Sequence, residues 1–138
     1  MRLDNSVITW AGPEFGASRH MAYLILTVMK FDPATRSVMN IRYSKERIAQ
    51  LKREGFLLSR FDRRLEPKAA KKSIKSSVEW GIGEALKRMK NVPDFIYDEG
   101  DIGMEPQIRV LGKSPMDVAA KILKSTGIEE IGRIITHQ

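Results

Sequence analysis

The chain has 138 residues, and 24 lysines and arginines against 17 acidic residues give a net charge of +7 with both histidines neutral. This is the length of one domain, and 42% apolar with 30% charged residues is the composition of a packed domain, not of a disordered or fibrous chain. Without cysteine, disulfides, thiolate nucleophiles, Cys-type zinc sites and iron–sulfur clusters are excluded. No apolar run reaches the roughly 18 residues of a membrane span and no signal peptide is visible, so we expect a cytoplasmic protein.

Helix and strand signals alternate through the first half of the chain. They predict strands at 7–10, 38–43 and 56–61, a helix capped by Ser18, a short helix begun by Asp32 and Pro33, and a helix from Ser44 to Gly55.

The second half continues this alternation. Ser76 and Glu79 form a capping-box pattern that predicts a helix start, and strands are predicted at 94–98 and 108–111. Ser114 opens a last helix that Gly127 can end, and the segment 128–138 is ambiguous. Such alternation favours an α/β layered domain, which we expect to span residues 1–138.

The excess positive charge is concentrated in segments 60–75 and 87–90. A basic balance suits nucleic acid, acidic lipid or a phosphorylated metabolite. Because mixed charge runs are usually solvated surfaces, we do not favour nucleic-acid binding.

A glycine-containing loop at 12–20 is the first candidate site. Backbone amides at Gly16, Ala17 and Ser18 precede Arg19 and His20 at a helix start, which is a pattern that can hold a phosphate. A capped helix whose arginine and histidine point to solvent explains the same residues equally well.

Asn40 and Arg42 form a second candidate, because they share one face of a predicted strand at its end. A half-exposed strand with a polar face is the simpler interpretation.

The third candidate is the turn framed by Gly100 and Gly103. It carries four carboxylates within eight residues and is followed by Arg109; the carboxylates are those of Asp98, Glu99, Asp101 and Glu105. A divalent cation that bridges carboxylate oxygens and a substrate diphosphate suits such a loop, although its spacing is not that of an EF-hand. An ordinary Asp- and Gly-rich turn is the alternative.

Several catalytic templates are excluded. The chain has no Gly-x-Ser-x-Gly elbow and no Gly-x4-Gly-Lys-Ser/Thr loop, and its two histidines cannot build a zinc site without help from carboxylates.

Taken together, several motifs resemble one family. They are Gly-Pro-Glu-Phe-Gly-Ala-Ser-Arg-His (12–20), Asp32-Pro33 with Arg36, Met-Asn-Ile-Arg-Tyr (39–43), Trp80-Gly81, Pro-Asp-Phe-Ile-Tyr-Asp (93–98), the turn from Gly100 to Pro106, and Ile-Arg-Val-Leu-Gly (108–112). The chain resembles the archaeal-type thiamine-phosphate synthase domain, which is usually the carboxyl-terminal part of a fusion with hydroxymethylpyrimidine (phosphate) kinase. The resemblance covers residues 2 to 123.

The resemblance implies a three-layer α/β/α fold with a mixed, mostly antiparallel sheet, similar to class II aldolase-like domains. It also implies condensation of hydroxymethylpyrimidine diphosphate with hydroxyethylthiazole phosphate, which yields thiamine phosphate and pyrophosphate. A related set of regulators uses this domain as a non-catalytic sensor of thiamine phosphates, and we keep this as the alternative.

The resemblance assigns the family's histidine to His20 and the adjacent arginine to Arg19, as catalytic residues. We expect Mg²⁺ at Asp98 and Asp101, with the substrate phosphates held by the remaining residues of the three candidates: Gly16, Ala17, Ser18, Asn40, Arg42, Gly100, Gly103, Glu105 and Arg109.

Two further expectations concern the whole protein. Family members carry an upstream segment with a conserved arginine, so we expect either a truncated piece of a fusion protein or a shortened homologue. The apolar tail suits a subunit interface, and we expect a homodimer, although completion of the domain's own core explains the tail equally well; the residues are Ile128, Ile131, Ile134 and Ile135.

Overall fold

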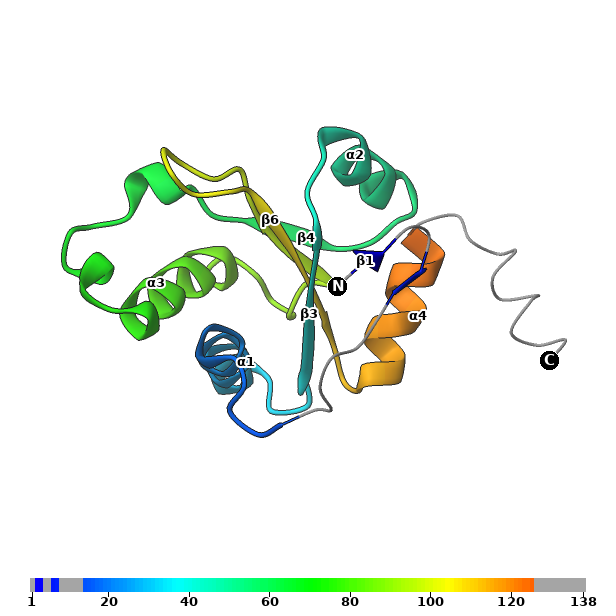
Figure 1. Cartoon of the computed structure of the whole chain (residues 1–138), viewed down its shortest axis with the longest axis horizontal. Helices are drawn as coiled ribbons and strands as arrows, with labels where there is room; N and C mark the ends of the chain where they lie inside the picture. The colour runs from blue at the N-terminus through cyan, green and yellow to red at the C-terminus, as the bar shows by residue number, and fades with distance from the viewer. Residues whose placement is uncertain (1, 4–5, 8–13, 126–138) are drawn as a thin grey trace, which may run out of the picture.

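The computed structural model describes residues 2–3, 6–7 and 14–125 (Figure 1). Its strands are β1 (Arg2–Leu3), β2 (Ser6–Val7), β3 (Ser37–Arg42), β4 (Leu58–Arg60), β5 (Phe95–Asp98) and β6 (Gln107–Gly112). Its helices are α1 (Arg19–Phe31), α2 (Lys45–Arg53), α3 (Ile74–Leu86) and α4 (Pro115–Ser125), with 3₁₀ turns η1 (Arg63–Leu65) and η2 (Ala70–Lys72). Among the described helices, none is long and apolar enough to span a bilayer.

Four strands form the central sheet in the order β3-β6-β5-β4. The β3–β6 and β6–β5 pairs are antiparallel, whereas β5 and β4 run parallel. This confirms the mixed, mostly antiparallel sheet; the likeness to class II aldolase-like domains stays a prediction. In the register of the sheet, Arg109 lies between Asn40 on β3 and Ile96 on β5, so these three side chains share one face.

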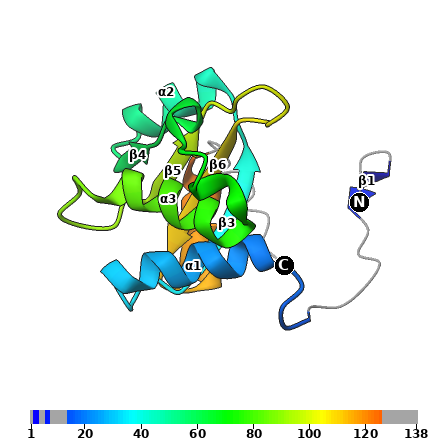
Figure 2. The same ribbon diagram turned by 90° about the vertical axis from the view of Figure 1, so that its left-hand side faces the viewer.

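Helices cover both faces of the sheet and make three layers (Figure 1). On one face, α1 and α3 pack together in front of the strands (Figure 2). Their buried core includes Leu24, Val28, Val78, Ile82, Ile96 and Leu111. Helices α2 and α4 cover the other face through Ile48, Leu51, Phe95, Ile108, Val110 and Val118. The three-layer α/β/α prediction is therefore confirmed.

Serine caps fix where the helices begin. Ser18 Oγ accepts the amide of Met21 at 3.2 Å, and Ser44 Oγ accepts the amide of Arg47 at 3.0 Å, as predicted. The predicted capping box at Ser76 is wrong, because Ser73 has the extended backbone of a cap and accepts the Ser76 amide at 3.1 Å. The cap of α3 therefore lies three residues before the predicted one, and the helix begins at Ile74.

Asp32 ends a helix instead of beginning one. It follows α1 as the C-cap, and its carboxylate accepts the amide of Ala34 at 3.0 Å and the hydroxyl of Thr35 at 3.1 Å. The short predicted helix is therefore wrong, since the turn uses the carboxylate that would have capped it.

Some predictions fall outside the described residues. Of the strand predicted at 7–10, only Val7 is described, as the end of β2. The stop at Gly127 and the tail at 128–138, on which the homodimer prediction depends, also lie outside.

Candidate functional site

A fully buried carboxylate at the end of β5 is the centre of a charged cluster. Asp98 Oδ1 accepts the Nε–H of Arg63 at 3.2 Å and the amide of Gly100 at 2.9 Å. Asp98 Oδ2 lies 2.9 Å from Nη1 of Arg109, an ion pair without the alignment of a hydrogen bond. One carboxylate therefore sits between two guanidinium groups brought together from η1 and β6.

The ring of Phe61 packs against both guanidinium groups. The guanidinium carbons of Arg63 and Arg109 lie 5.3 and 5.1 Å from the centre of its ring. Trp80 packs edge-on against the same ring, with 6.1 Å between the two ring centres. Gly81 has no side chain, and a Cβ there would collide with the ring of Phe61. Cation–π contacts of this length orient the arginines as well as stabilising them.

A second carboxylate completes the charge balance. Buried Glu66 lies 3.6 Å from Nη1 of Arg63 and accepts the hydroxyl of Ser77 at 2.9 Å. Two arginines thus face two carboxylates in a poorly solvated place, where an unpaired charge would be strongly destabilising.

His20 approaches this cluster from the second residue of α1. Its Nε2 is buried and has no hydrogen-bond partner among the described residues. Burial lowers the pKa of His20, the charges of Arg109 and Arg63 lower it further, and Asp98 opposes them. The imidazole is therefore neutral at pH 7.

Within the described part of the chain, the buried side-chain atoms without a hydrogen bond lie in this cluster. They are His20 Nε2, Asp98 Oδ2, and Nε and Nη1 of Arg109. Asp98 Oδ2 and Arg109 Nη1 are ion-paired with each other at 2.9 Å, which leaves His20 Nε2 and Arg109 Nε without a polar partner among the described residues. Native proteins leave few such atoms, and each needs an explanation such as a binding role.

The cluster opens to solvent through a pocket. His20, Arg63, Ser77 and Val78 line both a small cavity of about 10 Å³ that touches Arg109 and an open pocket of about 440 Å³. The open pocket, named here the Arg63 pocket, is completed by Glu66, Lys71, Ser73, Ile74, Asp101, Ile102 and Met104.

The predicted phosphate loop is exposed and only partly near this pocket. Gly16 has a φ of +70°, which confirms a turn, and Ala17, Ser18 and Arg19 are all exposed. The hydroxyl of Ser18 is engaged as the helix cap. Of this loop, the described pocket linings include only His20.

The second predicted candidate lies beside the cluster. Asn40 and Arg42 are exposed on edge strand β3, and they share the α1/α3 face of the sheet with Arg109. Asn40 is the direct cross-strand neighbour of Arg109. The fold therefore brings Asn40 and Arg42 next to the buried charges, where a substrate phosphate could reach them.

In the third candidate, the glycines are needed for the turn itself. Gly100 and Gly103 have φ values of +77° and +75°, and a Cβ on Gly100 would lie 2.5 Å from the carbonyl oxygen of Met104. The Gly100 amide is used by Asp98, and Glu105 is exposed at the end of the turn.

The carboxylates do not fit the predicted magnesium site. Both oxygens of Asp98 face arginines, and Oδ1 of Asp101 accepts the amide of Ile102 at 2.8 Å. Within the described ranges, no three potential ligand residues come together, so this part of the chain by itself offers no complete metal site. A hard cation needs carboxylate oxygens free of competing cations, and the arginines occupy that role at Asp98.

Sequence reasoning missed Arg63, Glu66 and Ser77. Arg63 lies in a run with Arg60 and Arg64, yet it alone of the three is buried. No local pattern separates these arginines, because the burial of Arg63 depends on Asp98, which lies 35 residues away.

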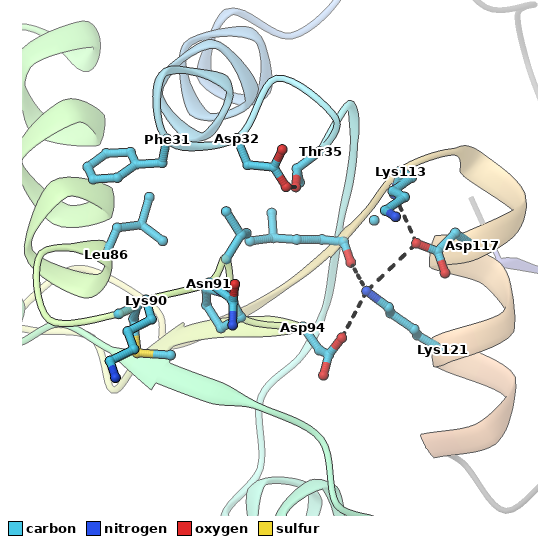
Figure 3. A pocket seen from close by; sticks show the side chains of 15 residues that line it. Phe31, Asp32, Thr35, Leu86, Lys90, Asn91, Asp94, Lys113, Asp117 and Lys121 are labelled. Carbon is cyan, nitrogen blue, oxygen red and sulfur yellow. Dashed lines mark hydrogen bonds and ion pairs between the residues drawn. The ribbon is translucent and has the colours of Figure 1, made fainter.

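A second pocket, of about 520 Å³, lies at the opposite end of the sheet (Figure 3). Lys121 Nζ donates to the carbonyl oxygen of Leu111 at 2.7 Å and lies 3.0 Å from Asp94 and 3.8 Å from Asp117. This ammonium therefore makes one hydrogen bond to the backbone and lies within ion-pair distance of two carboxylates, which is the arrangement of a structural charge cluster.

The fold and the site together define the class of protein: a three-layer α/β/α domain with a buried arginine–carboxylate cluster beneath an open pocket. The family model described as thiamine-phosphate synthase ThiN matches residues 1–124. The chain belongs to this family, which confirms the resemblance.

Two relatives and one solved structure agree with this assignment to the family. The chain is 45% identical over 109 residues to the bifunctional thiamine biosynthesis protein ThiDN of Methanocaldococcus jannaschii, covering 79% of this chain and 25% of that protein. It is 36% identical over 112 residues to thiamine-phosphate synthase ThiN of Methanothermobacter thermautotrophicus, covering 81% and 59%. A crystal structure of the C-terminal domain of phosphomethylpyrimidine kinase is 44% identical with a TM-score of 0.82, covering 90% of this chain and 70% of that one. The chain thus spans less than two thirds of either curated relative.

Proposed function

We propose that the chain acts in thiamine biosynthesis as a transferase that joins hydroxymethylpyrimidine diphosphate to hydroxyethylthiazole phosphate. The observation that carries this proposal is the buried, neutral, unpartnered His20 Nε2 beside Arg63 and Arg109 at an open pocket. The family model and the names of both relatives favour this catalytic role over the alternative of a regulator's thiamine-phosphate sensor.

The reaction needs charge stabilisation more than acid–base chemistry. The bond between the pyrimidine methylene and the diphosphate oxygen breaks, and its electron pair leaves with pyrophosphate. The thiazole nitrogen then supplies the electron pair of the new C–N bond, so atoms and electrons balance. Cations that are already oriented stabilise the charge on the leaving group without reorganisation.

The roles that we propose for His20, Arg19 and Arg42 follow from the hydrogen-bond donors of their side chains. Neutral His20 can donate one hydrogen bond from Nε2 to the leaving oxygen, in the tautomer that carries the proton there. Arg19 and Arg42, both exposed, can contact phosphates as the substrates enter. No step is assigned to Mg²⁺, because Asp98 and Asp101 do not fit it.

The test is product formation by this chain with both phosphorylated precursors, detected as thiamine phosphate by mass spectrometry. We expect turnover by the wild type and a loss of about 100-fold or more in His20→Gln. The matched control is Lys121→Met at the opposite pocket, which should keep its activity. Calorimetric binding of thiamine phosphate without any product would instead support the sensor and contradict the synthase.

A further inference from the structure

Arg63 is a buried arginine that is oriented by Asp98 and lines the Arg63 pocket. Only 8% of the residue is exposed, and Asp98 holds its Nε. Among the described residues this is the one hydrogen bond of its side chain, since the 3.6 Å ion pair of Nη1 with Glu66 is too long to be one. The terminal amino groups therefore keep donors for a ligand, and the fork of an arginine matches phosphate oxygens.

The other walls of the pocket add positive potential from separate elements. Helix α3 begins here at its cap Ser73 and carries no acidic residue in its own first turn, so its amino-terminal dipole adds positive potential beside the Glu66 carboxylate that accepts the Ser77 hydroxyl. Lys71, at the centre of η2, adds an ammonium to the lining, and His20 adds the unpartnered Nε2.

The two carboxylates of the pocket differ in availability. Glu66 is occupied by the hydroxyl of Ser77 and by Arg63. Asp101 is half-buried on the glycine turn, where one oxygen accepts the Ile102 amide and the other makes no hydrogen bond among the described residues. Asp101 can therefore accept from an amino group of a ligand.

Exposed apolar side chains form the rim. Ile74 and Met104 are 54% and 45% exposed, and Ile102 is 98% exposed, although all three line the pocket. Exposed apolar groups beside a charged pocket suit a flat ring that would bury them.

We propose that the Arg63 pocket binds the pyrimidine substrate, with its diphosphate on Arg63, Lys71 and the start of α3, and its amino-bearing ring between the apolar rim and Asp101. The identity of the ring rests on the proposed function, whereas the diphosphate subsite rests on the pocket alone. Arg63 is then a binding residue for the leaving group, which the sequence placed in a solvated basic run.

Calorimetric titration with inorganic pyrophosphate, in buffer without divalent cations, tests the subsite. Lys71→Ala and Lys72→Ala remove the same charge from the same 3₁₀ turn, but only Lys71 lines the pocket. We expect the dissociation constant to rise about fivefold in Lys71→Ala and to stay within about twofold in Lys72→Ala. Equal losses in the two variants, or no binding to the wild type, would overturn the subsite.

Two more variants, each with its unfolding midpoint measured alongside binding, test the two halves of the proposal. Arg63→Lys keeps a positive charge near Asp98 but removes the fork and the Nε–H, so binding should weaken about tenfold, while the unfolding midpoint should fall less than in Asp98→Asn, which removes the shared carboxylate. Asp101→Asn should leave pyrophosphate binding unchanged or tighter, because a nearby negative charge is removed, yet should reduce thiamine phosphate formation through weaker binding of the ring. Unchanged pyrophosphate binding in Arg63→Lys, or unchanged product formation in Asp101→Asn, contradicts the corresponding part of the proposal.

Failure of the subsite and failure of the proposed function give different results. If the wild type forms no thiamine phosphate while Lys71→Ala and Lys72→Ala still differ in pyrophosphate binding, the synthase function fails and the diphosphate subsite stands. If product forms equally in both variants and pyrophosphate binding does not distinguish them, the function stands and the subsite fails.

Discussion

The two ends of the sheet both carry buried or half-buried ion pairs, but among the described residues only the end of β5 carries buried side-chain atoms without a hydrogen bond. At the far end, Lys121 is surrounded by three acceptors in a pocket of about 520 Å³ (Figure 3). At the end of β5, Asp98, Arg109 and His20 carry buried atoms without hydrogen bonds, beside an open pocket.

This difference is the basis on which we propose a ligand site at the β5 end and not at the far end. Lys121 donates to a backbone carbonyl and lies within ion-pair distance of two carboxylates, whereas the proposed subsite uses terminal amino groups of Arg63 that make no hydrogen bond within the described residues. Pocket volume alone does not make this distinction; the far pocket is the larger of the two.

The largest expected contrast is in stability. Asp98→Asn leaves Arg63 and Arg109 without their shared carboxylate in a dry place, so the free energy of unfolding should fall by about 3–5 kcal/mol. Asp94→Asn removes a partly exposed partner of Lys121 and should cost about 1 kcal/mol or less. Urea denaturation of both variants measures the contrast, and equal costs would remove the distinction between the two ends.

Glycine packing offers a second contrast. An alanine Cβ at Gly81 would lie 2.7 Å from the ring of Phe61, and one at Gly112 would lie 2.8 Å from Asp117. Both substitutions should destabilise by about 1–3 kcal/mol through overpacking. Only Gly81→Ala should also weaken pyrophosphate binding, because Phe61 supports Arg63 and Arg109.

Gly83→Ala is the control for this pair, since nothing lies within 4 Å of its added Cβ. It should stabilise α3 by about 0.5–1 kcal/mol and leave binding unchanged. Thermal unfolding and calorimetry on the same preparations provide both readouts. Normal pyrophosphate binding by Gly81→Ala would contradict the supporting role of Phe61.

The smallest expected effect is a pH dependence. In the free protein, burial, Arg109 and Arg63 lower the pKa of His20 against the opposing effect of Asp98. A bound anion offsets the two positive charges and raises that pKa, so binding takes up a proton and tightens as the pH falls from about 7 toward 5, by less than about tenfold per unit. Other charged groups of the pocket are Glu66, Lys71 and Asp101.

Calorimetry in buffers of different ionisation enthalpy measures this proton uptake, and His20→Gln corrects for protonation of pyrophosphate itself. The same lowered pKa has a consequence for the free protein. Below the ordinary value of 6.5 the unfolded chain binds more protons than the folded one, so stability falls as the pH decreases through that range, and His20→Gln should remove this component. Identical proton uptake in the wild type and the variant would exclude His20 from the site.

Local sequence signals determined much of the fold. Ser18 and Ser44 cap helices because their hydroxyls accept amides three residues along the chain, and Gly55, Gly100 and Gly103 adopt positive φ where turns were predicted. The same local signals failed at Ser76 and Asp32. In each case a nearby residue or turn competed for the same hydrogen bonds, a choice that propensity alone does not settle.

The site was only partly predictable for a physical reason. The sequence by itself determined the layered α/β class, and it placed His20, Asn40, Arg42, Asp98 and Arg109 among the candidates from their positions at element ends. Only the tertiary structure decided how these groups are arranged: it buried Asp98 between two arginines, which face both of its carboxylate oxygens, and it buried Arg63 alone among the arginines of its basic run. Charges respond to neighbours brought together across the fold, and 35 residues separate Arg63 from the carboxylate that orients it.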